Sequence, residues 1–279
     1  MAHTLEQAIA AGADLLALSS ESAKLDAQVL LLHILQEPRS YLFTWPEHAL
    51  SDEQQSQFNV FIQRRLKGEP VAHITGLREF WSLSLEVNAT TLIPRPDTET
   101  LVEQALEIAL PATAKVLDLG TGTGAIALAL GSEMPSWQIT AVDRVSDAVA
   151  LATRNQQRLA INNVHVKQSN WFSELHGEKF NLIVTNPPYI ESSDIHLNQG
   201  DVRFEPLSAL VADDCGMSDI KQIITQSRDY LSSNGYLLIE HGFEQGEAVR
   251  HFFEKMAFVN IKTVKDLGNN DRVTLALWP

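Results

Sequence analysis

The chain has 279 residues, 44% of them hydrophobic, which is enough for one large domain or two ordinary ones and excludes a disordered chain. Lys and Arg total 21 against 35 Asp and Glu, a formal net charge of -14. This charge disfavours direct binding of nucleic acid, because phosphate binding depends on Lys and Arg. The single cysteine, Cys215, excludes an internal disulfide and a cysteine-based zinc cluster.

The first residues lack a basic leader followed by an apolar core, so we expect no signal peptide. No stretch of the sequence approaches the roughly 18 apolar residues of a membrane span. We therefore expect a cytoplasmic protein that acts as a monomer and contacts no membrane.

Residues 4–67 are predicted to form helices. Thr4 with Gln7, and Ser51 with Gln54, fit the capping-box pattern at two helix starts. Apolar residues at helical spacing are expected to form the buried stripe of the second helix: Leu25, Val29, Leu32 and Leu35. These features predict a small helical domain over residues 1–75.

Residues 76–93 change to the alternating pattern of strands, which predicts a β-hairpin linking two domains. From residue 94 to 279 strands alternate with amphipathic segments, typical of an α/β fold with a mostly parallel sheet covered on both faces. Seven strands are expected, the last of them antiparallel, at 115–119, 138–142, 163–168, 180–185, 235–240, 258–264 and 272–278.

A glycine loop follows the first of these strands, with the sequence Gly120-Thr121-Gly122-Thr123-Gly124. Glycines permit a tight turn and close approach of a ligand, and the helix that follows offers free N–H groups. The loop suits the carboxylate of S-adenosylmethionine, but Gly120, Gly122 and Ala125 also fit the dinucleotide fingerprint. Asp143, at the end of the second strand, suits the ribose of either cofactor. Asp118, just before the loop, favours the cationic S-adenosylmethionine.

The motif Asn186-Pro187-Pro188-Tyr189 ends the fourth strand, which we expect beside the first, so that the motif faces the glycine loop. Asn186 can accept a hydrogen bond through its side-chain oxygen, and the carbonyl of Pro187 can accept another. The prolines fix the backbone, and Tyr189 offers a flat face for a planar group. The motif therefore indicates transfer to a planar, amide-like nitrogen, which needs positioning more than a strong base.

Several segments together resemble the release factor glutamine methyltransferases over nearly the whole length. They are Gly76–Leu83, Leu92–Glu99, Asp118–Gly124, Asn186–Tyr189 and Gly200–Pro206. The resemblance implies a Rossmann-like class I methyltransferase sheet, with an N-terminal helical domain that binds the substrate. It also implies methylation of the glutamine side chain in the Gly-Gly-Gln motif of peptide chain release factors, in translation termination. S-adenosyl-L-methionine would be the donor and S-adenosyl-L-homocysteine the product.

The resemblance also implies residue roles. Gly120, Thr121, Gly122, Thr123 and Gly124 would wrap the methionine part of the cofactor, Asp143 would hold the ribose, and Trp171 would lie beside the adenine. Asn186, Pro187, Pro188 and Tyr189 would hold the glutamine amide, and Asn186 would also contact the cofactor. Asn170 departs from the aspartate that often precedes the aromatic residue, which weakens the expectation for the adenine contacts.

Other interpretations remain open at this point. A close alternative is glutamine methylation of a ribosomal protein, and a more distant one is methylation of adenine N6 in nucleic acid. A regulator that binds S-adenosylmethionine without catalysis, or an NAD-dependent oxidoreductase, is disfavoured by the intact Asn-Pro-Pro-Tyr motif. No roles are assigned to Asp97 and Glu205, and three arginines are expected to stabilise loops or contact the substrate: Arg78, Arg95 and Arg203.

Overall fold

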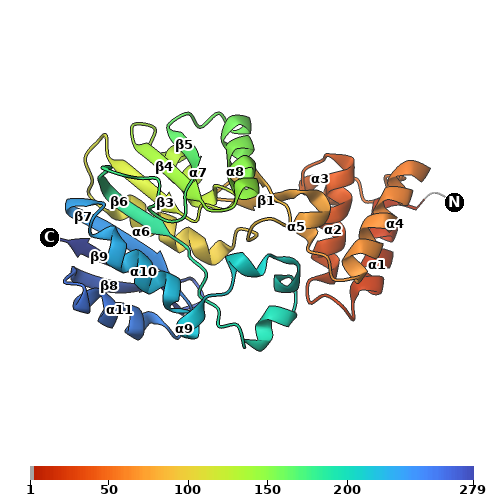
Figure 1. Cartoon of the computed structure of the whole chain (residues 1–279). Helices are drawn as coiled ribbons and strands as arrows, with labels where there is room; N and C mark the ends of the chain where they lie inside the picture. The colour runs from red at the N-terminus through yellow and green to blue at the C-terminus, as the bar shows by residue number, and fades with distance from the viewer. Residues whose placement is uncertain (1–2) are drawn as a thin grey trace. The chain divides into compact units, whose positions relative to one another are not determined.

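The computed structural model describes residues 3–279, which form two compact units (Figure 1). The first unit takes in the chain up to Leu77 together with the short segment Asn198–Phe204. The second comprises Arg78–Leu197 and Glu205–Pro279, so it includes most of the hairpin that the sequence suggests as a separate linker. Within residues 3–279, no helix is both long enough and apolar enough to cross a membrane.

The first unit is helical, and its two main helix starts are capped as the sequence predicts. The Thr4 hydroxyl accepts a hydrogen bond from the Gln7 backbone at 3.3 Å, and the Gln7 side chain accepts one from the Thr4 backbone at 3.1 Å. Ser51 and Gln54 form the same reciprocal pair. The helices are α1 (Leu5–Leu16), α2 (Ala23–Leu35), α3 (Ser40–Thr44), α4 (Asp52–Leu66) and α5 (Val71–Thr75).

The predicted buried stripe of α2 is wrong at Leu25 and Val29, whereas Leu32 and Leu35 are partly buried and pack against the core. The residues of α2 that face the core are Ala27, Leu30 and Leu31, which are fully buried, whereas Leu25 and Val29 are 46% and 38% exposed. Apolar residues occupy more than one side of this helix, so their spacing does not select a single face. Packing against α1 and α4 selects it instead.

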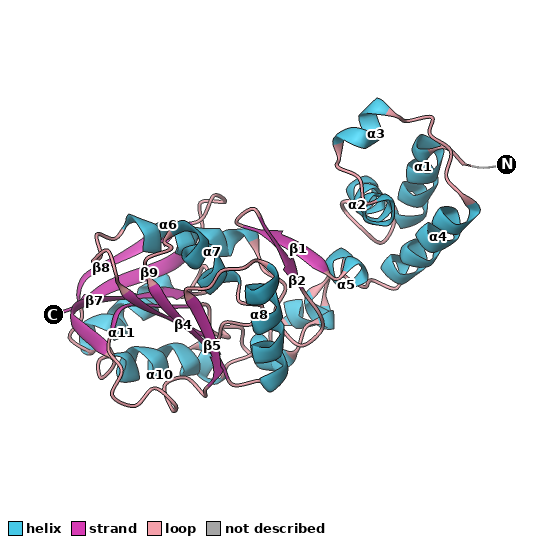
Figure 2. Ribbon diagram, turned by 90° about the horizontal axis from the view of Figure 1, so that it is seen from above, coloured by secondary structure: helices cyan, strands magenta, loops and turns pink. Residues whose placement is uncertain are grey.

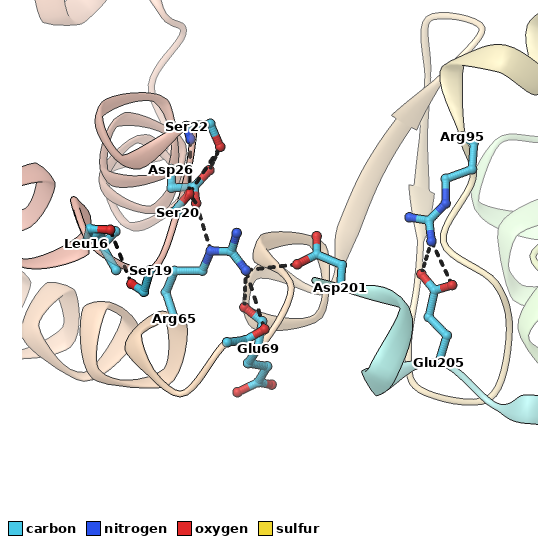
Figure 3. A network of polar contacts seen from close by, with 11 residues as sticks. Leu16, Ser19, Ser20, Ser22, Asp26, Arg65, Glu69, Arg95, Asp201 and Glu205 are labelled. Atoms are coloured by element: carbon cyan, nitrogen blue, oxygen red, sulfur yellow. Dashed lines mark hydrogen bonds and ion pairs between the residues drawn. The ribbon is translucent and has the colours of Figure 1, made fainter. Parts of the chain in front are cut away.

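A polar network joins the segment Asn198–Phe204 to the helices of the first unit (Figure 3). Arg65, at the end of α4, donates through Nε to Asp26 Oδ2 at 2.7 Å and through Nη1 to Asp201 Oδ1 at 2.9 Å. Two serine hydroxyls, of Ser20 and Ser22, also donate to Asp26, each at 2.8 Å. Asp26 is therefore a buried carboxylate with its hydrogen bonds satisfied.

The second unit is built on a seven-stranded sheet with the order β5-β4-β3-β6-β7-β9-β8. Strand β9 is antiparallel to its neighbours β7 and β8, and the other paired strands are parallel, which confirms the predicted fold class. The strands are β3 (Lys115–Leu119), β4 (Gln138–Asp143), β5 (Val164–Gln168), β6 (Phe180–Thr185), β7 (Leu231–Glu240), β8 (Val259–Lys265) and β9 (Asp271–Trp278). A separate two-stranded hairpin is formed by β1 (Leu77–Phe80) and β2 (Leu83–Glu86).

Both faces of the central strands are buried, which explains why β3 and β6 read as continuous apolar runs. Val116 and Leu182 lie in one core with α6 (Glu99–Glu107) and α7 (Ala125–Glu133). Their neighbours in sequence, Leu117 and Ile183, lie in the opposite core with α10 (Ser218–Ser227) and α11 (Gly246–Lys255). Figure 2 shows these two helix layers on opposite sides of the sheet. The remaining helices of the unit are α8 (Ser146–Arg158) and the short α9 (Asp213–Gly216).

Strand β3 lies between β4 and β6, so the chain order reverses beside it. In open α/β sheets, ligands bind beyond the carboxyl ends of the strands at such a point. The turns after β3, β4 and β6 carry the glycine loop, Asp143 and Asn186, and the topology therefore brings these three predicted features to one edge of the sheet.

Candidate functional site

A pocket opens at this edge of the sheet. The space that it surrounds, open solvent included, amounts to about 910 Å³. Its wall is formed by the segment after the hairpin, the glycine loop, the turns after β4 and β5, the Asn-Pro-Pro-Tyr turn and two residues of a later loop. The lining residues are Thr90, Thr91, Leu92, Pro94, Thr98, Gly120, Thr121, Gly122, Thr123, Ala125, Ile126, Asp143, Arg144, Val145, Ala148, Ser169, Asn170, Trp171, Asn186, Pro188, Ser208 and Ala209.

The glycine loop needs its glycines for conformation. Gly120, Gly122 and Gly124 have φ values of +70°, +55° and +86°, a region that side chains with a Cβ rarely adopt. A Cβ at Gly120 would also lie 3.3 Å from the ring of Trp171. Gly120 and Gly122 line the pocket, whereas Gly124 lies behind it as the N-cap residue of α7.

Asp143 supports this loop from the end of β4. Its Oδ2 accepts a hydrogen bond from the Gly122 backbone at 3.0 Å, and its Oδ1 accepts one from the Val145 backbone at 2.9 Å. A carboxylate has about four lone-pair sites, so these two bonds leave capacity for ligand hydroxyls. The residue lines the pocket and is only half-buried, so it is accessible to a ligand.

Asp118, whose negative charge at the strand end was taken to favour a cationic cofactor, does not face the pocket. Its side chain is fully buried and is not part of the pocket wall. Oδ2 accepts from the Thr121 hydroxyl at 2.6 Å and from the Ala127 backbone at 3.3 Å. Burial raises the pKa of this carboxyl to about 7, although the two hydrogen bonds oppose the increase. Asp118 therefore stabilises the glycine loop from behind.

The Asn-Pro-Pro-Tyr turn contributes two residues to the pocket wall, Asn186 and Pro188. Asn186 Nδ2 donates a hydrogen bond to Thr98 Oγ1 at 3.2 Å. Pro187 is buried and Tyr189 is half-buried, and neither is among the lining residues. The turn therefore lies at the pocket with its asparagine amide held on one side.

Tyr189 is held at both its backbone and its hydroxyl. Its carbonyl accepts a hydrogen bond from Gln245 Nε2 at 3.0 Å, and its hydroxyl donates to Glu240 Oε1 at 3.4 Å. Burial and the negative charge of Glu240 raise the pKa of the phenol above its ordinary value, so the hydroxyl keeps its proton. Tyr189 is a fixed neutral ring beside the turn.

Trp171 and Asn170 follow β5 and both line the pocket. Trp171 is 9% exposed, has a φ of +50° and lies against Gly120. Asn170 is exposed. The structure thus places the indole, but not the amide, in close contact with the glycine loop.

The three arginines that were expected to stabilise loops or contact the substrate each contact groups within their own unit. Arg95 contacts both carboxylate oxygens of Glu205, at 2.7 and 2.8 Å (Figure 3). Arg78 donates to the backbone carbonyl of Pro94 at 3.2 Å. Arg203 lies over the ring of its neighbour Phe204, 5.1 Å from the centroid. Asp97, also unassigned, lies 3.5 Å from Arg272.

Sequence reasoning missed two residues of the site, Thr98 and Glu240. Thr98 lines the pocket and accepts from Asn186, and Glu240 lies behind Tyr189. Glu240 offered a usable signal, because a carboxylate at the end of an apolar strand lies at the ligand-binding edge of such a sheet. Thr98 offered none, because its contact with Asn186 spans 88 positions of the sequence.

The residues of this pocket fit S-adenosylmethionine. A left-handed glycine loop before a helix N-terminus suits a carboxylate, Asp143 suits ribose hydroxyls, and Trp171 offers a flat apolar surface for a base. Among residues 3–279, no group of three or more His, Cys, Asp or Glu side chains could hold a metal ion.

The comparison with known proteins agrees with this geometry. The model of the PrmC N-terminal domain matches residues 7–76, and that of the methyltransferase small domain matches residues 96–203. The release factor glutamine methyltransferase of Shewanella oneidensis is 59% identical over 263 residues, covering 94% of this chain and 92% of that protein. The release factor glutamine methyltransferase of Escherichia coli is 56% identical over 260 residues, covering 93% and 94%.

A solved structure shares the fold at much lower identity. A methyltransferase from Pyrococcus furiosus superimposes with a TM-score of 0.55 at 16% identity, covering 77% of this chain and 96% of that chain. The resemblance predicted from the sequence is confirmed by the curated relatives, which extend across both units. By this identity over nearly its whole length, the chain belongs to the family of release factor glutamine methyltransferases.

Proposed function

We propose that this methyltransferase transfers a methyl group from S-adenosylmethionine to the side-chain amide nitrogen of the glutamine in the Gly-Gly-Gln motif of peptide chain release factors. Membership of the family supports the release factor as the substrate. The Gly-Gly-Gln glutamine is the finer part of the proposal. It rests on the sequence resemblance and on the chemistry of the pocket.

The observation that carries the proposal is the orientation of Asn186. Its Nδ2 is directed to Thr98, so its Oδ1 remains available to accept a hydrogen bond from another group. An amide NH2 bound at the pocket can donate one proton to this oxygen. The acceptor nitrogen would then be fixed beside the glycine loop, where Gly120 and Asn186 line the same cavity.

Positioning is the main requirement of the reaction. Bound S-adenosylmethionine supplies a methyl group on a positively charged sulfur. The methyl carbon would leave the sulfur as it bonds to the nitrogen, S-adenosylhomocysteine would be released, and the nitrogen would lose one proton to water. The amide nitrogen is a weak nucleophile because its lone pair is shared with the carbonyl. Holding its hydrogens at Asn186 and the Pro187 carbonyl, with its plane against Tyr189, would supply the orientation on which the rate depends.

The cofactor would be held by residues that the sequence singled out. The backbone of Gly120–Gly124 would receive the methionine part, and Asp143 would accept from the ribose hydroxyls with the lone pairs that Gly122 and Val145 leave open. Trp171 would cover the adenine, since it lines the pocket against Gly120. Asn186 would lie where cofactor and acceptor meet.

The helical first unit would bind the release factor. Several of its large apolar side chains are exposed, including Leu18, Phe43 and Trp45 at 103%, 69% and 58%. Exposed aromatic and aliphatic side chains of this size commonly mark protein interfaces. A protein substrate also agrees with the net charge of -14, which disfavours a nucleic acid.

One labelling experiment tests the proposal. The protein is incubated with methyl-labelled S-adenosylmethionine and a release factor, and in parallel with the same factor carrying alanine for the glutamine of its Gly-Gly-Gln motif. We expect labelling of the first and none of the second. Equal labelling of both would exclude this glutamine. Ribosomal proteins and adenine-containing DNA, as further substrates, test the two alternatives directly.

A further inference from the structure

A buried carboxylate lies behind the Asn-Pro-Pro-Tyr turn. Glu240 ends β7, and the residue is 1% exposed. Tyr189 donates a hydrogen bond to Oε1 at 3.4 Å. The Thr98 hydroxyl favours the ionised carboxylate and lowers its pKa against the effect of burial. Oε2 has no partner of good hydrogen-bond geometry within residues 3–279. Burying a carboxylate with so few partners costs free energy, so its retention at this position needs an explanation.

Thr98 connects this carboxylate to Asn186. The Thr98 oxygen accepts a hydrogen bond from Asn186 Nδ2 at 3.2 Å. A hydroxyl has one proton to donate, and an ionised carboxylate can only accept. An ionised Glu240 would attract the Thr98 proton, and the Thr98 oxygen would then be left to accept from Asn186. Only the NH2 side of the asparagine amide satisfies that arrangement.

We propose that Glu240 and Thr98 are positioning residues, which together select the one orientation of the Asn186 amide that presents Oδ1 to the acceptor nitrogen. In the reversed orientation, the NH2 group of Asn186 would face the NH2 group of the acceptor amide. Both groups donate hydrogen bonds, so no hydrogen bond could form between them. The link to turnover rests on the proposed function of Asn186. The orientation of the amide is a property of the chain itself and can be measured without a substrate.

The same segment also fixes Tyr189. Gln245, five positions after Glu240, donates to the Tyr189 carbonyl at 3.0 Å, and its own Oε1 accepts from the Gly242 backbone at 2.9 Å. The tyrosine is therefore held at its backbone by Gln245 and at its hydroxyl by Glu240. Through Thr98 and Tyr189, one carboxylate acts on both the first and the last residue of the Asn-Pro-Pro-Tyr motif.

Protonation of Glu240 would remove the preference for this one orientation of the Asn186 amide. Burial raises its pKa to about 7. The Thr98 hydroxyl, Arg272 and the Tyr189 hydroxyl oppose the increase, and the negative charge of Asp97 adds to it. A protonated carboxyl can donate to Thr98, which frees the threonine proton to bond the oxygen of Asn186. We therefore expect kcat to fall as the pH is lowered through about 7, in step with the protonated fraction of Glu240.

Three variants test the arrangement by kinetics. Glu240→Gln and Thr98→Val should each lower kcat by up to about 100-fold, because misplacing a reacting group by a small distance has effects of that size. The dissociation constant of S-adenosylmethionine should not change. Thr98→Ser keeps the hydroxyl and loses the methyl, so its kcat should stay close to that of the wild type. A purely structural role for the methyl would give the opposite result, a slow Thr98→Ser and an active Thr98→Val, because valine keeps that methyl. The exposed Glu244→Gln is the matched control for loss of one charge.

The pH profile separates positioning from packing. Wild-type and Glu244→Gln enzyme should show the decrease of kcat below about pH 7, and Glu240→Gln should not show it in that range. An unchanged profile and an unchanged kcat in Glu240→Gln would overturn the inference, while labelling of the release factor by the wild type would still support the proposed function.

A direct readout needs no methyl acceptor. The Asn186 side-chain amide, labelled with ¹⁵N and assigned from its absence in Asn186→Ala, is followed by NMR as the pH is varied. Its NH2 resonances should titrate with a midpoint of about 7 in the wild type and should not titrate in Glu240→Gln or Thr98→Val. If the Asn186 NH2 resonances of the wild type do not change with pH, the inference is overturned, whatever the substrate is. A wild type that titrates but fails to label release factors would exclude the proposed function alone.

Discussion

Arg95 and Glu205 join two segments that are separated by 110 positions in the sequence, with one guanidinium nitrogen 2.7 and 2.8 Å from the two carboxylate oxygens. The Glu205 side chain is fully buried, whereas that of Arg95 is 31% exposed. Within the second unit, the segment Leu92–Glu99 is therefore joined to Glu205 by a charge pair. Leu92–Glu99 also carries Thr98, so the charge pair helps to hold the segment whose threonine accepts a hydrogen bond from Asn186.

Removing the two partners should have unequal effects on stability. Arg95→Met removes the charged hydrogen bonds to both oxygens of the buried Glu205 and should lower the free energy of unfolding by about 1–3 kcal/mol. Glu205→Gln leaves a neutral amide that can still accept from the exposed arginine, so the decrease should be smaller. Urea unfolding at pH 7.5 measures both. Equal losses in the two variants would show that the pair contributes by shape alone.

Asn186→Ala should separate binding from turnover. The alanine removes the oxygen that is proposed to hold the acceptor amide, so kcat should decrease by about 100-fold or more. The dissociation constant of S-adenosylmethionine should stay within a few-fold of the wild-type value, because the glycine loop and Asp143 are unchanged. Isothermal titration calorimetry and single-turnover labelling measure the two quantities. A weakened affinity with normal turnover at saturation would assign Asn186 to the cofactor instead.

The features that the sequence predicted well are local. Strand β3 and its glycine loop follow from consecutive residues, and the capping boxes at Thr4 and Ser51 each span four residues. The order of the strands followed from general rules for α/β folds, which place β6 beside β3. Asp118 was correctly seen at the strand end. Its direction away from the pocket was not predicted, because a position in a strand does not show which groups surround the side chain.

The features that the sequence did not predict depend on long-range contacts. Nothing in the composition of Asn198–Phe204 shows that this segment packs with the first unit, since its partner Arg65 is 136 positions away from Asp201. The role of Glu240 likewise requires Thr98 and Tyr189 to be placed together. In α2 the apolar residues surround the helix, so the choice of Leu30 and Leu31 over Leu25 depended on the neighbouring helices.

Arg65 should stabilise the first unit through Asp26 more than through Asp201. The side chain of Asp26 is 8% exposed and that of Asp201 is 40% exposed. Arg65→Met should lower the free energy of unfolding by about 1–3 kcal/mol, less than for an isolated buried charge because Ser20 and Ser22 still donate to Asp26. Asp201→Asn removes only the more exposed ion pair between Arg65 and Asp201. It should change the free energy of unfolding by less than about 1 kcal/mol. Urea unfolding followed by far-UV circular dichroism measures both, and a larger effect of Asp201→Asn would contradict this ranking.

The buried Asp118 should make stability depend on pH. Its folded-state pKa of about 7 is above the ordinary value of 3.8, so the folded protein keeps this proton over a range in which the unfolded chain has lost it. The free energy of unfolding should therefore fall as the pH rises from about 4 to about 7, by a few kcal/mol from this group, and stay level above that range. Asp118→Asn cannot ionise, so its stability relative to the wild type should increase from pH 5 to pH 8 in urea unfolding. A difference that does not vary with pH would show that Asp118 is ionised throughout.

The affinity for S-adenosylmethionine should depend on Asp143 through two separate effects. Both of its oxygens already accept backbone hydrogen bonds, from Gly122 and Val145. An asparagine at this position can accept only one of them, and its NH2 group would face a second backbone N–H. Asp143→Asn should therefore disturb the glycine loop and also weaken the ribose contact, raising the dissociation constant about 10- to 100-fold.

Trp171→Leu provides the comparison, because it removes the aromatic surface while leaving the hydrogen bonds of Asp143 in place. We expect a smaller increase of about tenfold in the dissociation constant, in line with the loss of one base-stacking contact. The control is Asp147→Asn, an exposed carboxylate on α8 that has the same change of charge and lies outside the pocket wall. It should leave the affinity unchanged in calorimetric titration. An equal loss of affinity in Asp147→Asn would mean that the charge of the surface, rather than the geometry of Asp143, controls binding.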